Sequence, residues 1–419
     1  MTKKDFSSDV VVRQTFNFRQ KKQIFAGACA IAISVGLIRA DFGVVAGLMV
    51  EDGWLKPHDI GVLAGLNMVG YLLGSFHQSQ IREQLELKRC LLIAVIAAIL
   101  SLGLASFNSG LIGEAVLRVT AGWSAGHLLS GSPSLALSGI PVQLQRRASA
   151  AILGGGGGGT VLGASAISLF QPPTATTGWG TLAVLNLILA GPVIWLIRTQ
   201  RLQEFEAKKI QAGSASMAVT RTEQRRVLLI SLLGFGIFLA GAGRVPMFVY
   251  GPLVAESLLN ITGSFGILSI GLAGLGALTA SFCLISLPRS ITTHLLLPLA
   301  AAIGLLGSFL YVMSASLSTL LVSGFLLGAW GISISSLTLA QLNTIAPVTA
   351  RRRLWSLFTT LQALAFLLFS MFTAPFADQR LPLLLEIGMM VLIVQFAIEL
   401  AYAGGMRHQN IIDSEKSQA

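Results

Sequence analysis

The sequence predicts an all-α polytopic membrane protein with twelve transmembrane helices, arranged as two parallel six-helix pseudo-repeats. Three observations lead to this fold class. Only 11% of the 419 residues are charged and 53% are hydrophobic, with a mean hydropathy of +0.75. Soluble domains average about 25% charged residues, so this chain lacks the charge to cover a water-facing surface. In addition, long apolar stretches recur along the chain, and its two halves resemble each other.

The length of each apolar stretch determines whether it can cross the bilayer. A hydrocarbon core of about 30 Å needs about 20 apolar residues at a rise of about 1.5 Å each. The expected spans are residues 24–50, 59–81, 90–108, 111–136, 149–170, 179–198, 227–254, 263–286, 294–313, 317–341, 354–377 and 382–404. The loops between them are too short to hold a separate soluble domain.

The polar segments divide the chain into five parts. We expect an N-terminal tail, a six-span bundle, a linker, a second six-span bundle and a C-terminal tail. Their bounds are residues 1–23, 24–198, 199–226, 227–404 and 405–419. The basic N-terminal stretch is too long for a signal peptide, so the first span is expected to remain uncleaved.

The distribution of Lys and Arg sets the orientation. Lys56 and Arg380 fall on one side of the predicted membrane, and Arg39, Arg118 and Arg244 fall inside spans. All the other basic residues lie on the side of the N-terminus, which the positive-inside rule places in the cytoplasm. Both termini are therefore expected in the cytoplasm. This distribution explains the net charge of +11 without a nucleic-acid partner.

The two halves match in register. At an offset of 205 residues, residues 36–39 lie over residues 241–244, and the pair Arg146 and Arg147 lies over Arg351 and Arg352. Six spans in each half keep both halves in the same orientation, so the repeat is parallel and its axis runs along the membrane normal. In transporters built this way, the substrate site lies between the halves near the midplane.

Several motifs resemble those of the major facilitator superfamily, and the whole pattern is most similar to the YbfB/YjiJ group of bacterial transporters. The most specific run is residues 67–74 in the second span. The other matching residues are Gly36, Arg39, Phe42 and Met49 in the first span, Gly234, Phe235 and Gly236 in the seventh, and Gly324, Phe325, Gly328 and Leu337 in the tenth. The chain departs from the group at Ile38, Ala40 and Asp41 and at residues 361–366. The resemblance implies secondary transport by alternating access, with the spans in the inner membrane of a bacterium.

The superfamily's loop motif after the second span is only partly retained. It survives as Gly74, Arg82, Lys88 and Arg89, whereas His77 and Gln78 stand where the resemblance implies an Asp-Arg pair. The fourth-span RxxxG motif is present as Arg118 and Gly122, and the fifth span contains six consecutive glycines. The residues expected to serve gating or helix packing are Gly74, Arg82, Gly122, Gly154, Gly158 and Gly163.

The glycine run at residues 154–159 has two interpretations. A phosphate-binding loop is one, but no Gly-Lys-Ser/Thr follows and the run lies inside an apolar span. The interpretation that we prefer is close approach of two helices in lipid.

Two arginines occupy equivalent positions in the repeat. Arg39 and Arg244 lie near the middle of the first and seventh spans, where a charge faces a cavity or a partner by default. Two guanidinium groups in one central cavity would suit an anionic substrate, because Arg binds carboxylates and phosphates bidentately. The alternative is that each arginine pairs with a carboxylate or with carbonyls and serves packing alone. The expected substrate-binding residues are Arg39, Asn67, Tyr71, Arg244, Trp330 and Gln362.

Three further ionisable residues lie within spans. Glu114 and Arg118 are at i and i+4, which favours an intrahelical pair of purely structural value. The alternative is that Asp41 or Glu114 is a proton-coupling carboxylate with Arg118 as its partner. Of the two we favour Asp41, since it lies deeper.

The sequence therefore predicts a secondary active transporter for a small organic solute, with the two arginines suggesting an anion and with proton coupling as the energy source. The expected partners are the solute, the proton and the lipid bilayer, and the protein is expected to be a monomer without cofactor or metal. A membrane enzyme is disfavoured because the five histidines are scattered and no HExxH motif occurs. A non-transporting sensor or scaffold on the same fold remains the alternative.

Overall fold

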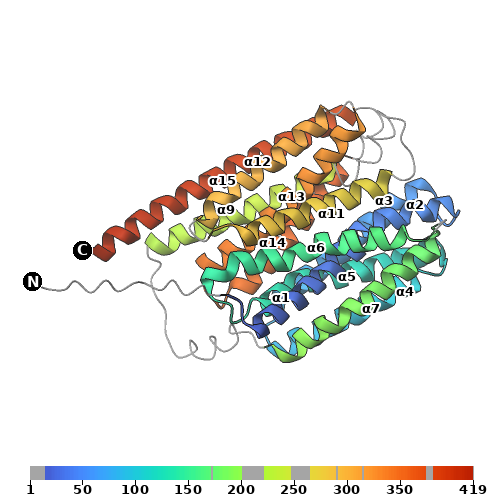
Figure 1. The fold of residues 1–419 in the computed structure, drawn as a ribbon, viewed down its shortest axis with the longest axis horizontal. Coiled ribbons are helices and arrows are strands. Elements are labelled where there is room, and N and C mark those ends of the chain that lie inside the picture. Colours follow the sequence, from blue (N-terminus) through green and yellow to red (C-terminus); the bar gives the residue numbers. More distant parts are fainter. Residues whose placement is uncertain are drawn as a thin grey trace, which may run out of the picture.

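The computed structural model describes residues 15–170, 173–200, 221–246, 265–288, 291–313, 316–373 and 381–418. In these residues the secondary structure is entirely helical, and the helices run roughly along the long axis of the molecule (Figure 1). The predicted all-α fold is confirmed.

The N-terminal half begins with a span built from three consecutive helical segments. These are α1 (Phe18–Ile31), a π-helix η1 (Ala32–Ala40) and α2 (Phe42–Glu51). The remaining elements of this half are α3 (Pro57–Gln80), α4 (Gln84–Leu104), α5 (Gly110–Ala136), the short η2 (Val142–Leu144), α6 (Gln145–Ile167) and α7 (Ala175–Thr199).

The C-terminal half repeats this order. Its long helices are α9 (Arg221–Gly243), α11 (Phe265–Ser286), α12 (Thr293–Val312), α13 (Leu317–Ile345), α14 (Arg351–Thr373) and α15 (Leu381–Gln418). The halves meet through α6 against α11 and through α3 against α14, in the middle of the molecule (Figure 1).

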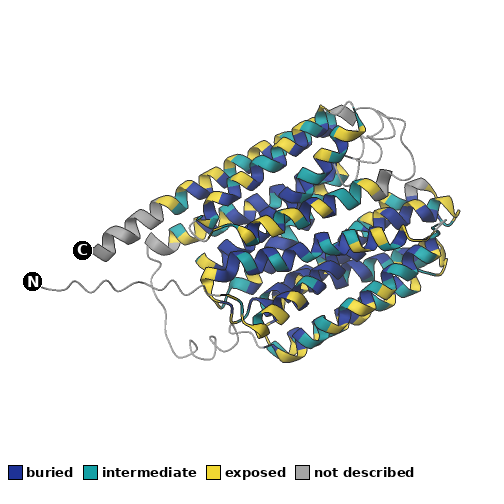
Figure 2. Cartoon of the chain, in the orientation of Figure 1, coloured by how far each residue is buried: buried dark blue, intermediate teal, exposed yellow. Residues whose placement is uncertain are grey.

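Each predicted span corresponds to one long helix or, for the first span, to one continuous helical stretch. Eleven of these segments are long and apolar enough to cross a membrane by length and composition. The remaining one, α5, contains Glu114, Arg118 and His127, which lower its hydropathy although its length fits. Figure 2 shows buried residues concentrated in the middle of the molecule, while large apolar side chains such as Ile112 and Phe282 are exposed, as lipid-facing residues are.

Some predicted boundaries were wrong. The first helix begins at Phe18 because Asn17 and Gln20 form a capping box. At the other end, α15 continues to Gln418, so most of the predicted tail is helical. Residues 1–14 of the N-terminal tail, residues 201–220 of the linker and the part of the seventh span after residue 246 lie outside the described residues.

Glycines let neighbouring helices pack backbone against backbone. A Cβ added to Gly74 of α3 would collide with the Trp123 carbonyl of α5, and one added to Gly122 of α5 would collide with the Asn67 carbonyl of α3. Such small-residue contacts are typical of helix packing in lipid. Gly74 and Gly122 therefore lie where packing requires glycine.

The glycine run of α6 allows contact on two sides. Gly155 packs against the backbone of Ala28 in its own half, and Gly154 packs against Ser281 in the other half. Gly158 has only an ordinary contact with Leu278, whereas Gly163 lies against the Asp41 carboxylate. Because α6 is a continuous helix through the run, the run has no phosphate-loop geometry.

Candidate transport site

Both central arginines lie where their helices lose regular geometry. Arg39 is in the π-helical segment η1, in which the Asp41 amide donates to the Gly36 carbonyl five residues earlier, at 3.0 Å. Arg244 follows the end of α9 at Gly243 and lies in a turn. π-Helical segments occur frequently at functional sites. The repeat thus places a guanidinium group at an equivalent irregularity in each half.

Arg39 is partly buried and rests on α3. Its guanidinium carbon lies 4.8 Å from the centroid of the Tyr71 ring. Its Nη2 donates to the sulfur of Met68 at 3.6 Å. These contacts orient the group through its face and one edge, and they leave other N–H groups for a ligand.

Arg244 is held in a similar way by α13. Its Nη2 donates to the Gly331 carbonyl at 2.7 Å and to the Ser335 hydroxyl at 3.3 Å. Its guanidinium carbon lies 5.6 Å from the centroid of the Trp330 ring. Each arginine is therefore placed against an aromatic ring of its own half.

The two arginines are close enough to interact across the halves. Arg39 repels Arg244 electrostatically, and Tyr71 is within electrostatic range of both. Among the described residues, neither guanidinium group forms an ion pair with a carboxylate. Of the packing alternative, pairing with a carboxylate is therefore not observed among the described residues, whereas pairing with a carbonyl is observed for Arg244 at Gly331.

The other expected binding residues differ in their surroundings. The Trp330 indole N–H and the Gln362 amide nitrogen have no hydrogen-bond partner, whereas the Tyr71 hydroxyl lies within reach of Thr359. In a membrane such groups need partners, so a ligand or water is expected there. Asn67 instead donates its side-chain amide to the Arg118 carbonyl at 3.1 Å, and this bond ties α3 to α5.

Arg118 forms no hydrogen bond with either expected partner, Glu114 or Asp41. All three of its side-chain nitrogens lack a hydrogen-bond partner, and the guanidinium group lies over the rings of Trp179 and Phe42, at 4.3 and 5.1 Å. Glu114 accepts a hydrogen bond from the Ser109 hydroxyl at 3.3 Å. Glu114 and Arg118 therefore attract each other electrostatically without a hydrogen bond, and two aromatic rings from other helices hold the cation by cation–π contact.

Asp41 is fully buried and lies apart from Arg118. Its carboxylate packs against Gly163 of α6, and neither oxygen has a hydrogen-bond partner. The expected partnership with Arg118 is therefore absent in this conformation, because residue 41 points to α6 while Arg118 points to α2 and α7. Asp41 nevertheless follows η1 directly, so it is linked through the backbone to Arg39.

One end of the molecule is closed by arginines that bind helix ends across the halves. Arg352 at the start of α14 donates to the carbonyls of Gln78 and Ile81 at 2.9 and 2.6 Å, and Arg353 donates to the Ser79 carbonyl at 3.2 Å. These acceptors form the C-terminal end of α3, where carbonyls lack intrahelical partners and attract cations.

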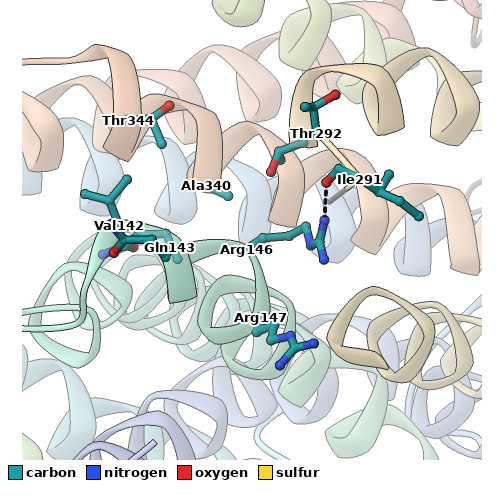
Figure 3. A pocket seen from close by; sticks show the side chains of 10 residues that line it. Val142, Gln143, Arg146, Arg147, Ile291, Thr292, Ala340 and Thr344 are labelled. Atoms are coloured by element: carbon teal, nitrogen blue, oxygen red, sulfur yellow. Dashed lines mark hydrogen bonds between the residues drawn. The ribbon is translucent and has the colours of Figure 1, made fainter. Parts of the chain in front are cut away.

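The same contact recurs at the end of α11. Arg146 donates to the carbonyls of Ile291, Leu287 and Pro288 at 2.6 to 2.8 Å, and Arg147 donates to the Leu287 carbonyl at 3.2 Å. Figure 3 shows Arg146 reaching Ile291 beside a pocket of about 390 Å³. We call Arg146, Arg147, Arg352 and Arg353 the arginine latch. Sequence reasoning used these residues for topology and repeat register but missed their bonds to carbonyls.

The altered loop motif takes part in this closure. The side-chain oxygen of Gln78 accepts a hydrogen bond from His127 at 2.7 Å, and the other ring nitrogen of His127 lies 3.2 Å from His77. Gln78 is thus fixed on α5 through its side chain while its carbonyl is bound by Arg352. Arg82, expected to act in gating, is exposed at the end of this loop.

Two six-helix halves with a polar centre and a closed end define a transporter of the major facilitator type. The family described as an uncharacterised MFS-type transporter YbfB matches residues 31–400, and the chain belongs to this family. It is therefore a multi-pass membrane protein of a transporter family. Membership of this family implies a small-molecule substrate and a lipid bilayer environment.

Solved structures with the same fold agree. The human organic anion transporter MFSD10 (TETRAN) has a TM-score of 0.68 at 12% identity, covering 91% of this chain and 99% of that chain. A bacterial homologue of the iron transporter ferroportin, in an outward-facing state, has a TM-score of 0.65 at 15% identity, covering 92% of this chain and 100% of that chain. No curated protein matches the sequence.

Proposed function

We propose that the protein carries a small organic anion across the bacterial inner membrane by alternating access, coupled to protons. The observation that carries this proposal is the pair Arg39 and Arg244. They come from opposite halves, each rests on an aromatic ring, and they repel each other with no carboxylate of the described residues paired to either.

The free-energy cost of two buried cations favours an anionic substrate over a neutral one. A charge at the centre of a bilayer costs at least about 2.5–3.5 kcal/mol, and two like charges within range of each other add to that cost. An anion that bridges both guanidinium groups removes the repulsion and supplies the missing acceptors. Trp330 and Gln362 offer additional donors to the same ligand.

The arginine latch supports transport over a sensor or scaffold. The loss of part of the loop motif is the reason to consider a protein that no longer alternates between conformations. Arg146 and Arg352 nevertheless close this end of the molecule through hydrogen bonds between the halves. In the proposed orientation the latch, both termini and residues 199–226 are cytoplasmic. The two bundles, residues 24–198 and 227–404, rock about the arginine site as a monomer.

Proton coupling is assigned to Asp41, with Glu114 and Arg118 on α5 as a second, separate ionisable group that takes part in it. Asp41 is a buried carboxyl group without a hydrogen-bond partner, and it directly follows the segment that carries Arg39. A change in its protonation can therefore act on the position of Arg39 through η1.

Replacing Asp41 by Asn is expected to remove the response of solute flux to a pH gradient. Flux is measured in proteoliposomes with and without the gradient, and Glu51→Gln, at an exposed position of α2, is the control that keeps the response. The expected result for the unmodified protein is a several-fold change in flux on imposing the gradient. Flux that is indifferent to both the gradient and Asp41→Asn would overturn the coupling proposal.

A further inference from the structure

A second group of buried polar side chains lies in the C-terminal half, on α15. Gln395, Glu399 and Tyr402 are spaced so that they share one face of the helix, and each has an exposed fraction of 0%. This helix packs against α9 and α12. The group is separate from the central arginines and has no role in the site described above.

Glu399 is buried without a partner. Neither carboxyl oxygen has a hydrogen bond, and neither end of the Gln395 amide has one. A titratable neighbour is Tyr402, which interacts electrostatically with Glu399 and donates its hydroxyl to the Gln341 side-chain oxygen of α13 at 2.9 Å.

No cation of the packed helices compensates Glu399 within the described residues. On α9, Arg225 donates to the Gly405 carbonyl at 3.3 Å, and on α12 the ring of His294 is buried. Neither is found to interact electrostatically with Glu399. An ionised carboxylate without a counter-ion is very costly in such surroundings.

The space beside the Glu399 carboxyl group is narrow. Gly236 of α9 packs directly against a carboxyl oxygen, so that even a methyl group does not fit between them. A bound metal ion needs room and several oxygen ligands, whereas the Gln341 oxygen is already used by Tyr402. A proton needs no added volume. It needs one hydrogen-bond acceptor, and the side-chain oxygen of Gln395, one turn earlier on the same face, can serve as that acceptor.

We propose that Glu399 is a proton-binding site of the C-terminal half, with the side-chain oxygen of Gln395 accepting the hydrogen bond from its carboxyl O–H. Gly236 of α9 precedes Arg244, just past the end of this helix, by eight residues, which corresponds to about 12 Å along the helix axis. A carboxylate formed by loss of this proton would attract Arg244, so proton occupancy is linked to the arginine site. This link rests on the proposed function, whereas the proton site itself does not.

Infrared difference spectroscopy of the full-length protein, between neutral and alkaline pH, tests the site without a substrate. An Asp41→Asn background removes the other carboxyl group that, among the described residues, has no hydrogen bond on either oxygen. We expect a carboxylic-acid band that Glu399→Gln eliminates and that Glu386→Gln, at an exposed position of the same helix, leaves intact. A spectrum in which Glu399→Gln removes no acid band would overturn the proposal.

A second variant guards against loss of folding. Gln395→Leu keeps the Glu399 carboxyl group but removes its acceptor, so the same band is expected to shift to higher frequency. An unchanged band in this variant contradicts the assigned hydrogen bond. Because no flux is measured, failure of proton-coupled transport would leave these spectra unaffected, and the two proposals can fail separately.

Discussion

Arg244→Ala is expected to weaken binding of the anionic substrate by at least about 10- to 100-fold, and Arg39→Ala is expected to do the same. A hydrogen bond to a charged group contributes about 1.5–3 kcal/mol, and each 1.4 kcal/mol is about tenfold in affinity. A bidentate contact increases the loss. Binding is measured through the fluorescence of Trp330, which lies against Arg244, or through the ligand-induced rise in melting temperature.

Two kinds of control sharpen this test. Arg39→Lys and Arg244→Lys keep the charge but lose the planar fork of donors, so each is expected to bind with intermediate affinity. Arg198→Ala removes an exposed cation at the end of α7 and should leave affinity unchanged. Undiminished affinity in both alanine variants of the central arginines would remove the anion site.

Arg352→Ala is expected to open the latched end of the molecule. The side chain is buried and makes two hydrogen bonds to carbonyls of the other half, so its loss leaves the Gln78 and Ile81 carbonyls without these donors. At about 1.5–3 kcal/mol per bond, the population closed at this end should fall at least about tenfold relative to the open one. Spin labels at Gln80 and Val348, both exposed near this end, report the change as a longer distance in pulsed electron resonance.

The neighbouring residue supplies a matched control. Arg351 donates to the Ala346 carbonyl of its own half at 3.1 Å, so Arg351→Ala removes a cation at the same end without removing a bond between halves. It should leave the distance distribution as it is. Equal distributions for Arg352→Ala and the unmodified protein would show that the latch does not hold the halves together.

The equivalent positions of Arg39 and Arg244 could be predicted, because the register of the repeat and the place of each residue within its span follow from the sequence. Their aromatic supports could be predicted only in part. Tyr71 and Trp330 were expected near the cavity as polar groups, but their contact with the guanidinium faces depends on how α3 and α13 pack.

The surroundings of Arg118 could not be predicted from local spacing. An i, i+4 carboxylate favours a pair within one helix, yet Phe42 and Trp179, far away in sequence, surround the guanidinium group. The latch shows the same limit. Arg146 and Arg352 are visible as a repeated basic pair, whereas their acceptors are carbonyls at helix ends from the opposite half, and main-chain acceptors leave no signature in side chains.

In the proposed cycle, Arg39 and Arg244 of opposite halves carry an anion through the membrane. Uptake of small organic acids into proteoliposomes, each compared with its uncharged amide analogue, measures this directly. We expect saturable uptake of at least one acid but not of its amide, and uptake at the level of empty liposomes for the double variant Arg39→Ala/Arg244→Ala. Equal uptake of acid and amide, or undiminished uptake by the double variant, would contradict it.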